Sequence, residues 1–403
     1  MEQPNKLSAA LHQYVQNHEI AGAAALVRKE GRLVYQETIG YADMEKGAPV
    51  TMDTMFRLAS MSKPVTGIAV MQLAEQGKLS LSDPVSRYMP EFARMKVCET
   101  NLLPMMYAPD ANSPTGQKAI QEQVDAMTYL PAQRDITFFD LMTHSSGLAM
   151  GPVGCAMMDR LPLPAGSLQE RVRQYASLPL DFQPGTASGY SPLAAFDLLG
   201  GLVELISGLP FEQYLKEKLF APLGVRDIAF TLTPDQAERV PRLYEYTEDG
   251  KLTDVTLSND GWGSMNPAKI GYPSGGGGLF GTVKDYEKIA HMLVNKGQLD
   301  GVRVLKEATV EAMAGAGMKE KHRPFPGSFW GLSMMVFDDC RTSKRGLTDG
   351  TFGWSGAFGT HFYIDPANQL EMVLGVNRSN IGGAGSYVSL AAEQAVFEEY
   401  LQK

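Results

Sequence analysis

The chain carries two kinds of hydrophobic spacing, and each kind occupies its own part of the sequence. Runs of β-branched and aromatic residues, bounded by glycine or Asp-Pro turns, predict strands near both ends. These strands are expected at residues 23–28, 32–38, 329–337, 361–364 and 370–376. Apolar residues at helical spacing predict helices at residues 7–15, 60–76, 139–143, 196–206 and 387–401. A mostly helical, loop-rich middle therefore separates two strand-forming ends.

This arrangement predicts an α+β fold with sandwich-like layers, in which one antiparallel sheet is flanked by helices and is formed by both chain ends. We expect residues 1–85 and 260–403 to form the α/β part, and residues 86–259 to form the mostly helical part. Residues 94–134 are irregular, with scattered prolines and methionines, and predict a long loop. Such a loop is either a candidate lid beside a functional site or a surface insertion without a functional role.

Composition and charge exclude several kinds of partner. The chain has 403 residues with 36 basic and 45 acidic side chains, which gives a formal net charge of −9. Because no basic block is present, neither nucleic acid nor a membrane surface is an expected partner. Cys98, Cys155 and Cys340 match no metal-binding spacing, so we expect neither a disulfide framework nor a metal site. The sequence shows no signal-peptide pattern and no apolar window of membrane-spanning length, which favours a cytoplasmic location.

Candidate chemistry begins at Ser60-Met61-Ser62-Lys63, where one of the predicted helices starts. A serine hydroxyl needs a neighbouring base before it acts as a nucleophile, and Lys63 lies one helical turn after Ser60. Backbone N–H groups at a helix N-terminus could also stabilise an oxyanion. The alternative is a capping serine followed by a solvated lysine. The apolar residues after Pro64 predict a buried helix, which favours the reactive interpretation.

Two later segments carry residues that an activated serine needs. Tyr190 follows a Pro-Gly turn and precedes a helix, so its hydroxyl could relay a proton, or its ring could pack at a domain boundary. The glycine-rich residues 353–360 could bring backbone N–H groups to a substrate carbonyl, or form only a turn. The glycines at 274–279 match no phosphate loop and could let one wall of a cleft come close. No cofactor is therefore expected.

Four segments taken together resemble the serine β-lactamase-related superfamily. They are residues 56–64, 141–148, 184–191 and 276–279. Within the superfamily the chain looks like class C β-lactamases and especially family VIII carboxylesterases, from about Leu7 to the final helix. The resemblance implies a β-lactamase/penicillin-binding-protein-like fold and an acyl-enzyme on Ser60, with Lys63 and Tyr190 sharing the general-base and general-acid work. Which of these two takes the first proton stays open.

The third motif of β-lactamases, Lys-Thr-Gly, aligns with Trp354-Ser355-Gly356 in this chain. The resemblance then implies that the backbone N–H groups of Ser60 and Ala357 form the oxyanion hole. The residues expected to contact substrate are Trp354, Ser355, Gly356, Gly277 and Gly278.

Two departures from the family pattern concern the substrate. Trp354 replaces a cation that helps hold the carboxylate of a β-lactam or of a peptide C-terminus, and it offers an apolar wall instead. Pro192 replaces the asparagine that the second family motif often carries. Both changes favour an uncharged ester as the small-molecule substrate. We therefore expect a serine carboxylesterase of the EC 3.1.1 type that acts on small to medium esters.

Other functions stay open for the same site. A Ser-Lys-Tyr arrangement also serves β-lactamases, D-amino-acid peptidases and acyltransferases, while a non-catalytic ligand-binding relative is the least expected outcome. His144 lies in a family block and is expected to be buried and structural. The chain contains no Gly-x-Ser-x-Gly elbow, which argues against an α/β-hydrolase. The physiological ester and the oligomeric state are not determined by the sequence.

Overall fold

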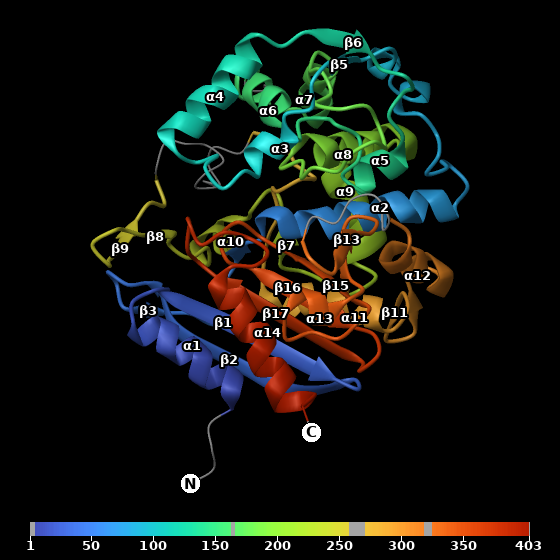
Figure 1. Cartoon of the computed structure of the whole chain (residues 1–403). Helices are drawn as coiled ribbons and strands as arrows, with labels where there is room; N and C mark the ends of the chain where they lie inside the picture. Colours follow the sequence, from blue (N-terminus) through green and yellow to red (C-terminus); the bar gives the residue numbers. More distant parts are fainter. Residues whose placement is uncertain (1–4, 163–165, 258–270, 318–324, 403) are drawn as a thin grey trace.

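The central feature of the fold is an eight-stranded antiparallel sheet built from both ends of the chain (Figure 1). The computed structural model describes residues 5–162, 166–257, 271–317 and 325–402. In spatial order the strands are β13 (Ser328–Trp330), β14 (Met335–Phe337), β15 (Thr351–Ser355), β16 (His361–Asp365), β17 (Leu370–Val376), β1 (Gly22–Lys29), β2 (Arg32–Asp43) and β3 (Ala48–Pro49). The predicted sheet is confirmed. The expected boundary at residue 260 lies outside the described residues.

Strand β1 joins the two ends of the chain, since it pairs with β2 on one side and with β17 on the other. The β1–β2 hairpin turns at Glu30 and Gly31, which adopt φ values of 51° and 73°. These positive values suit glycine, and they let a tight turn follow the right-handed twist of the strands. The first six residues of β1 are buried, because helices cover both faces of the sheet.

Helices α1 (Lys6–Gln16) and α14 (Tyr387–Tyr400) pack together over one face of the sheet, and α11 (Val283–Val294) packs against the other (Figure 1). Side chains of Asn5 and Thr282 cap α1 and α11 by accepting hydrogen bonds from free backbone N–H groups. One hydrophobic core then continues from the sheet through α2 (Ser62–Glu75) and α8 (Ala194–Ser207) into the helical part. The segments with candidate catalytic residues can therefore lie between two parts that share one core.

The helical part lies on one side of the sheet, with α2 between them (Figure 1). Its helices are α3 (Leu103–Met106), α4 (Pro114–Asp125), α5 (Phe138–Met142), α6 (Pro152–Asp159), α7 (Leu168–Tyr175), α8, α9 (Phe211–Leu215) and α10 (Pro234–Glu238). The remaining helices are α12 (Glu307–Gly315) and α13 (Cys340–Ser343). The short strands are β4 (Phe56–Arg57), β5 (Lys96–Cys98), β6 (Tyr129–Pro131), β7 (Ile228–Ala229), β8 (Tyr244–Tyr246), β9 (Leu252–Asp254), β10 (Phe280–Gly281), β11 (Gln298–Leu299) and β12 (Val302–Arg303).

Two sequence-based expectations are wrong in detail. Residues 329–337 form not one strand but the hairpin β13–β14, which reverses around Ser333 at φ 74° and is closed by a hydrogen bond from Gly331 N to Met334 O. The reversal was not predicted because the residues on both sides of it are apolar, and an apolar run does not indicate where the chain changes direction. Residues 94–134 are not a structureless loop, because β5 and β6 pair there and enclose α3 and α4.

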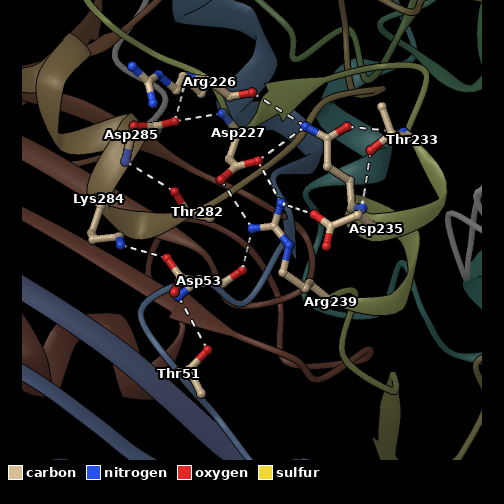
Figure 2. Close-up of polar contacts among 11 residues, drawn as sticks. Thr51, Asp53, Arg226, Asp227, Thr233, Asp235, Arg239, Thr282, Lys284 and Asp285 are labelled. Carbon is tan, nitrogen blue, oxygen red and sulfur yellow. Dashed lines mark hydrogen bonds and ion pairs between the residues drawn. The ribbon is translucent and has the colours of Figure 1, made fainter.

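Charged side chains fasten the loop that precedes β4 to the start of α11 (Figure 2). Arg239 donates to Asp227 Oδ1 at 2.7 Å and to the carbonyl oxygen of Asp53 at 3.1 Å. Lys284 in turn lies 2.6 Å from Asp53 Oδ1. The hydrogen bonds from Arg239 hold the pKa of Asp227 below its ordinary value. This cluster stabilises the chain a few residues before the candidate nucleophile.

Among the described residues, no single helix has both the length and the apolarity to cross a bilayer. The pair Ala194–Ser207 and Phe211–Phe220 passes that test only in combination, and it is bent by 77°.

Candidate active site

Ser60 lies in a 3₁₀ turn, Ala59–Met61, between strand β4 and helix α2. Ala59 has a φ of 45°, an uncommon conformation for a residue with a Cβ, so the turn is held by its surroundings. Helix α2 is buried from Ser62 through Leu73, as its apolar sequence predicts. Tyr286 Oη also donates to the carbonyl oxygen of Met61 at 2.9 Å. The serine is therefore fixed on a rigid element.

Lys63 lies one turn further along and is completely buried. Its Nζ donates three hydrogen bonds, to Ser60 Oγ at 3.1 Å, to Pro192 O at 2.7 Å and to Gly276 O at 2.6 Å. An ammonium group has three N–H donors, and here each of them has an acceptor. The geometry therefore suits the protonated amine.

Tyr190 completes the arrangement from a segment 130 residues away. Its Oη lies 2.6 Å from Ser60 Oγ, and Trp354 Nε1 donates to the same Oη at 3.3 Å. Lys63 Nζ lies 4.9 Å from the centre of the Tyr190 ring. The structure thus brings together the three polar groups that the sequence predicts to meet, and it adds an indole N–H.

His144 packs against Tyr190 and is buried, as predicted. Its Nδ1 accepts a hydrogen bond from Ser191 N at 3.1 Å, and its ring lies 4.9 Å from the Tyr190 ring. Complete burial, together with the charge of Lys63, holds the pKa of His144 well below its ordinary value. The imidazole is therefore neutral and packs as a structural group.

Ala357 lies in the turn that follows β15, close to the Ser60 segment. Thr360, in the same turn, donates from Oγ1 to the carbonyl oxygen of Leu58 at 3.3 Å. A Cβ placed on Gly356 would lie 2.4 Å from that carbonyl oxygen, so only glycine permits this approach. Within the described part of the chain, the backbone N–H groups of Ser60 and Ala357 donate to no other group. Both remain available to a substrate oxygen.

Ser60 opens onto a cavity of about 830 Å³, a volume typical of small-molecule sites. The lining residues are Ser60, Met106, Tyr107, Met150, Cys155, Ser188, Gly189, Tyr190, Pro192, Phe325, Trp330, Trp354, Ser355, Ala357, Gly383 and Ala384. None of these described residues is an acid, a lysine, an arginine or a histidine. Burial raises the pKa of Cys155 to about 12, so its thiol stays neutral as well.

Not every predicted substrate contact reaches this cavity. Gly277 and Gly278 are absent from its described lining. A Cβ on Gly278 would lie 3.0 Å from the ring of Phe230, and the neighbouring Gly276 offers its carbonyl oxygen to Lys63. This glycine run therefore packs behind the lysine. Gly356 likewise packs on the Ser60 segment, while Trp354 and Ser355 do line the cavity.

Asp197 is a fully buried residue of α8 that was not predicted to belong to the site. Its carboxyl group accepts hydrogen bonds from the side chains of Tyr175, Tyr272 and Ser274 and from Gly276 N at 3.0 Å. Burial raises its pKa, although these donors oppose the shift. Asp197 thereby fixes the segment whose carbonyl binds Lys63. An acid among the apolar residues of the first turn of α8 was the available signal.

Tyr107 and Met106 were also missed as residues of the site. They come from the 94–134 segment and line the cavity. Nothing in their spacing indicated that they approach Ser60, since the approach depends on how the segment folds back.

One group among the described residues has the composition of a metal site, namely Glu287, His291 and Glu371, whose ligand atoms lie within 4.8 Å of one another. Arg28 Nε lies 2.6 Å from Glu287 Oε1 and 3.6 Å from Glu371 Oε1. A guanidinium thus already supplies the positive charge that the carboxylates need. We assign this cluster to the packing of α11 on the sheet.

Comparisons with known proteins identify the family of the chain. A family model described as Beta-lactamase matches residues 7–395 of the chain. Protein Rv1367c of Mycobacterium tuberculosis is 35% identical over 376 residues, covering 88% of this chain and 85% of that protein. Esterase EstB of Burkholderia gladioli is 30% identical over 411 residues, covering 97% and 94%. The solved structure of EstCE1, a hydrolase with promiscuous acyltransferase activity, has a TM-score of 0.77 and 26% identity, covering 97% of each chain.

Proposed function

Because this chain belongs to the β-lactamase family of serine hydrolases, we propose that it is a carboxylesterase that cleaves uncharged esters through an acyl-enzyme on Ser60. The observation that carries the proposal is the cavity around Ser60, whose described lining contains no charged side chain. A β-lactam or a peptide C-terminus presents a carboxylate, and burying that charge without a cation is costly. A neutral acyl or alcohol group meets the aromatic rings and methionines of this lining without such a cost.

The bonding of Lys63 favours Tyr190 as the group that takes the first proton. All three N–H groups of Lys63 are donated, so its ammonium group has no free lone pair to act as a base. The positive charge of Lys63 and the N–H of Trp354 both stabilise negative charge on Tyr190 Oη. The step requires Tyr190 in its phenolate form: the Ser60 proton then moves 2.6 Å to Tyr190 Oη, which becomes a neutral phenol, while Ser60 Oγ attacks the acyl carbon.

The remaining steps use the same groups in turn. The acyl oxygen becomes negative and accepts hydrogen bonds from the N–H groups of Ser60 and Ala357. Tyr190 returns its proton to the departing alcohol oxygen, and the acyl group stays on Ser60. Water then attacks the acyl carbon and gives a proton to Tyr190, which passes it back to Ser60 as the acid leaves.

Replacing the nucleophile tests the proposal directly. Ser60→Ala should lower kcat/KM for 4-nitrophenyl esters by more than hundredfold, about 3 kcal/mol or more of transition-state stabilisation, with an unchanged melting temperature. Ser188→Ala removes another hydroxyl of the same cavity and should lose far less activity. Undiminished hydrolysis by Ser60→Ala would exclude Ser60 as the nucleophile.

An acyltransferase is the second candidate, because the same acyl-enzyme can react with an alcohol and because EstCE1 is described as having that promiscuous activity. Product analysis with a competing alcohol separates transfer from hydrolysis.

The β-lactamase and peptidase alternatives require an anionic substrate. Faster cleavage of nitrocefin than of any neutral ester would contradict the argument that Trp354, in place of a cation, favours uncharged substrates. A fluorophosphonate probe that fails to label Ser60 would favour a non-catalytic protein.

A further inference from the structure

A buried polar chain that the proposed mechanism does not use adjoins the cavity wall at Ser355. Ser355 Oγ lies 2.7 Å from His361 Nδ1, and His361 Nε2 lies 3.0 Å from Glu393 Oε1. Arg345 donates to both carboxylate oxygens of Glu393, from Nε at 2.7 Å and from Nη2. Ser355, His361 and Glu393 are each at most 4% exposed. Residues of β15, β16 and α14 thus form one connected network.

The strand geometry separates this network from Tyr190. Trp354 and Ser355 are neighbours on β15, so their side chains point to opposite faces of the sheet. Trp354 faces Tyr190, whereas Ser355 pairs in register with His361 on the face that α14 covers. Ser355 still belongs to the lining of the cavity. Ser355 is therefore the residue through which this network can contact a bound substrate.

The groups that face the His361 ring define its hydrogen bonds. Glu393 comes from α14, Ser355 from β15, and Tyr363 from β16 at a ring distance of 6.0 Å. Burial raises the pKa of Tyr363 well above its ordinary value, so this phenol stays neutral. The neighbouring strand β17 contributes the apolar Leu374 opposite His361. Glu393 and its partner Arg345 are thus the charges nearest to the ring.

Glu393 is held as a carboxylate. Burial alone would raise its pKa, but the contacts with His361 and Arg345 outweigh burial and lower it. A carboxylate can only accept hydrogen bonds, so the His361 nitrogen beside it, Nε2, must carry a proton. The contact is bent away from ideal hydrogen-bond geometry, yet a bare nitrogen lone pair at 3.0 Å from a carboxylate oxygen would be repelled.

The charge of the ring then decides which way the Ser355 hydroxyl donates. In a neutral ring with its proton on Nε2, Nδ1 is an acceptor, so Ser355 donates its O–H to Nδ1. In a cationic ring Nδ1 is a donor, so Ser355 accepts from it and its own O–H is released. One proton on His361 therefore changes Ser355 from an acceptor into a donor toward other groups.

We propose that His361 is a positioning residue that sets substrate selectivity, by controlling whether the Ser355 hydroxyl can donate a hydrogen bond into the cavity. This inference rests on the proposed esterase function. With a neutral His361 the wall at Ser355 offers only lone pairs, which repel an anionic substrate group. With a cationic His361 the hydroxyl donates to such a group. Selectivity for anionic over neutral esters should therefore rise as the pH falls.

The test compares 4-nitrophenyl hexanoate with 4-nitrophenyl hydrogen adipate, which has the same leaving group and chain length but ends in a carboxylate. Values of kcat/KM are measured from pH 5.5 to 8.5, where the adipate carboxylate stays ionised. Released 4-nitrophenol is quantified by chromatography, since its colour depends on pH. The ratio of the two kcat/KM values cancels every effect that both esters share.

In the wild-type protein the adipate-to-hexanoate ratio should rise roughly tenfold toward low pH, the scale of one hydrogen bond to a charged group. In His361→Phe the hydroxyl is free at every pH, so the ratio should stay at the high value. In Ser355→Ala the ratio should stay low. The exposed His12→Phe is the matched control and should keep the wild-type profile. A flat wild-type ratio, or an unchanged pH profile in His361→Phe, overturns the proposal.

Nuclear magnetic resonance of ¹⁵N-labelled histidine tests the same proposal without any substrate. The signals of His361 are those absent from His361→Phe. At high pH they should show a proton on Nε2, and the Nδ1 shift should move in Ser355→Ala. A neutral ring protonated on Nδ1 contradicts the proposal. If the wild-type protein hydrolyses neither ester, the esterase function fails, and this measurement still decides whether His361 controls Ser355.

Discussion

Replacing Trp354 by phenylalanine isolates the hydrogen bond that most distinguishes this site. The change removes the indole N–H that donates to Tyr190 Oη but keeps an aromatic ring against Tyr190, whose ring centre lies 5.4 Å away. A hydrogen bond to a charged group contributes about 1.5–3 kcal/mol. At 3.3 Å this bond is longer than an ideal N–H···O contact, which places it at the low end of that range. We therefore expect kcat to fall by about tenfold, which corresponds to about 1.4 kcal/mol.

The loss should appear in kcat more than in KM, because the N–H of Trp354 stabilises the Tyr190 phenolate that takes the Ser60 proton, and this proton moves in the chemical step and not in substrate binding. Steady-state kinetics with 4-nitrophenyl hexanoate measures both constants. Trp330→Phe is the matched control, since Trp330 stacks on Tyr190 at 5.8 Å and donates no hydrogen bond to it within the described chain. The reasoning is refuted if the two variants lower kcat equally, because lost ring volume would then explain both effects.

Two further predictions concern stability. Gly375→Ala should lower the free energy of unfolding by about 1–3 kcal/mol, because the new Cβ would lie 2.6 Å from the buried Phe56 ring. Gly315→Ala is the control and should be nearly neutral, because its Cβ would meet nothing within 4 Å. Urea unfolding measures the free energy of both variants, and equal effects would contradict the packing argument. Because Arg239 lowers the pKa of Asp227, the stability that this carboxylate contributes is fully present above its unfolded pKa of about 3.9 and is lost as the pH falls through the lower folded value. The difference in unfolding free energy between wild type and Asp227→Asn should therefore shrink below about pH 4, and a difference that persists to pH 3 would oppose this assignment.

Some elements could be predicted because their signal is local. The apolar sequence after Pro64 indicates a buried helix, and α2 is buried along most of its length. The hairpin of β1 and β2 follows from Lys29-Glu30-Gly31 between two strand-forming runs. The β13–β14 reversal at Ser333 was not predicted in this way, because both of its strands are apolar. The residue with positive φ is a serine, which has a weaker turn preference than glycine.

The sequence by itself determined the type of fold, the rigid position of Ser60 before a buried helix, and the three side chains that should meet around it. The first two depend on hydrophobic period and on a motif whose residues lie close together in the chain, whereas the meeting of the three side chains was implied by the resemblance of separate segments to a known family. Only the tertiary structure decided that Trp354 donates to Tyr190, that Gly278 packs against Phe230, and that His361 meets Glu393. Such contacts join residues far apart in the chain, and they depend on strand register and on how helices pack, which no local pattern encodes.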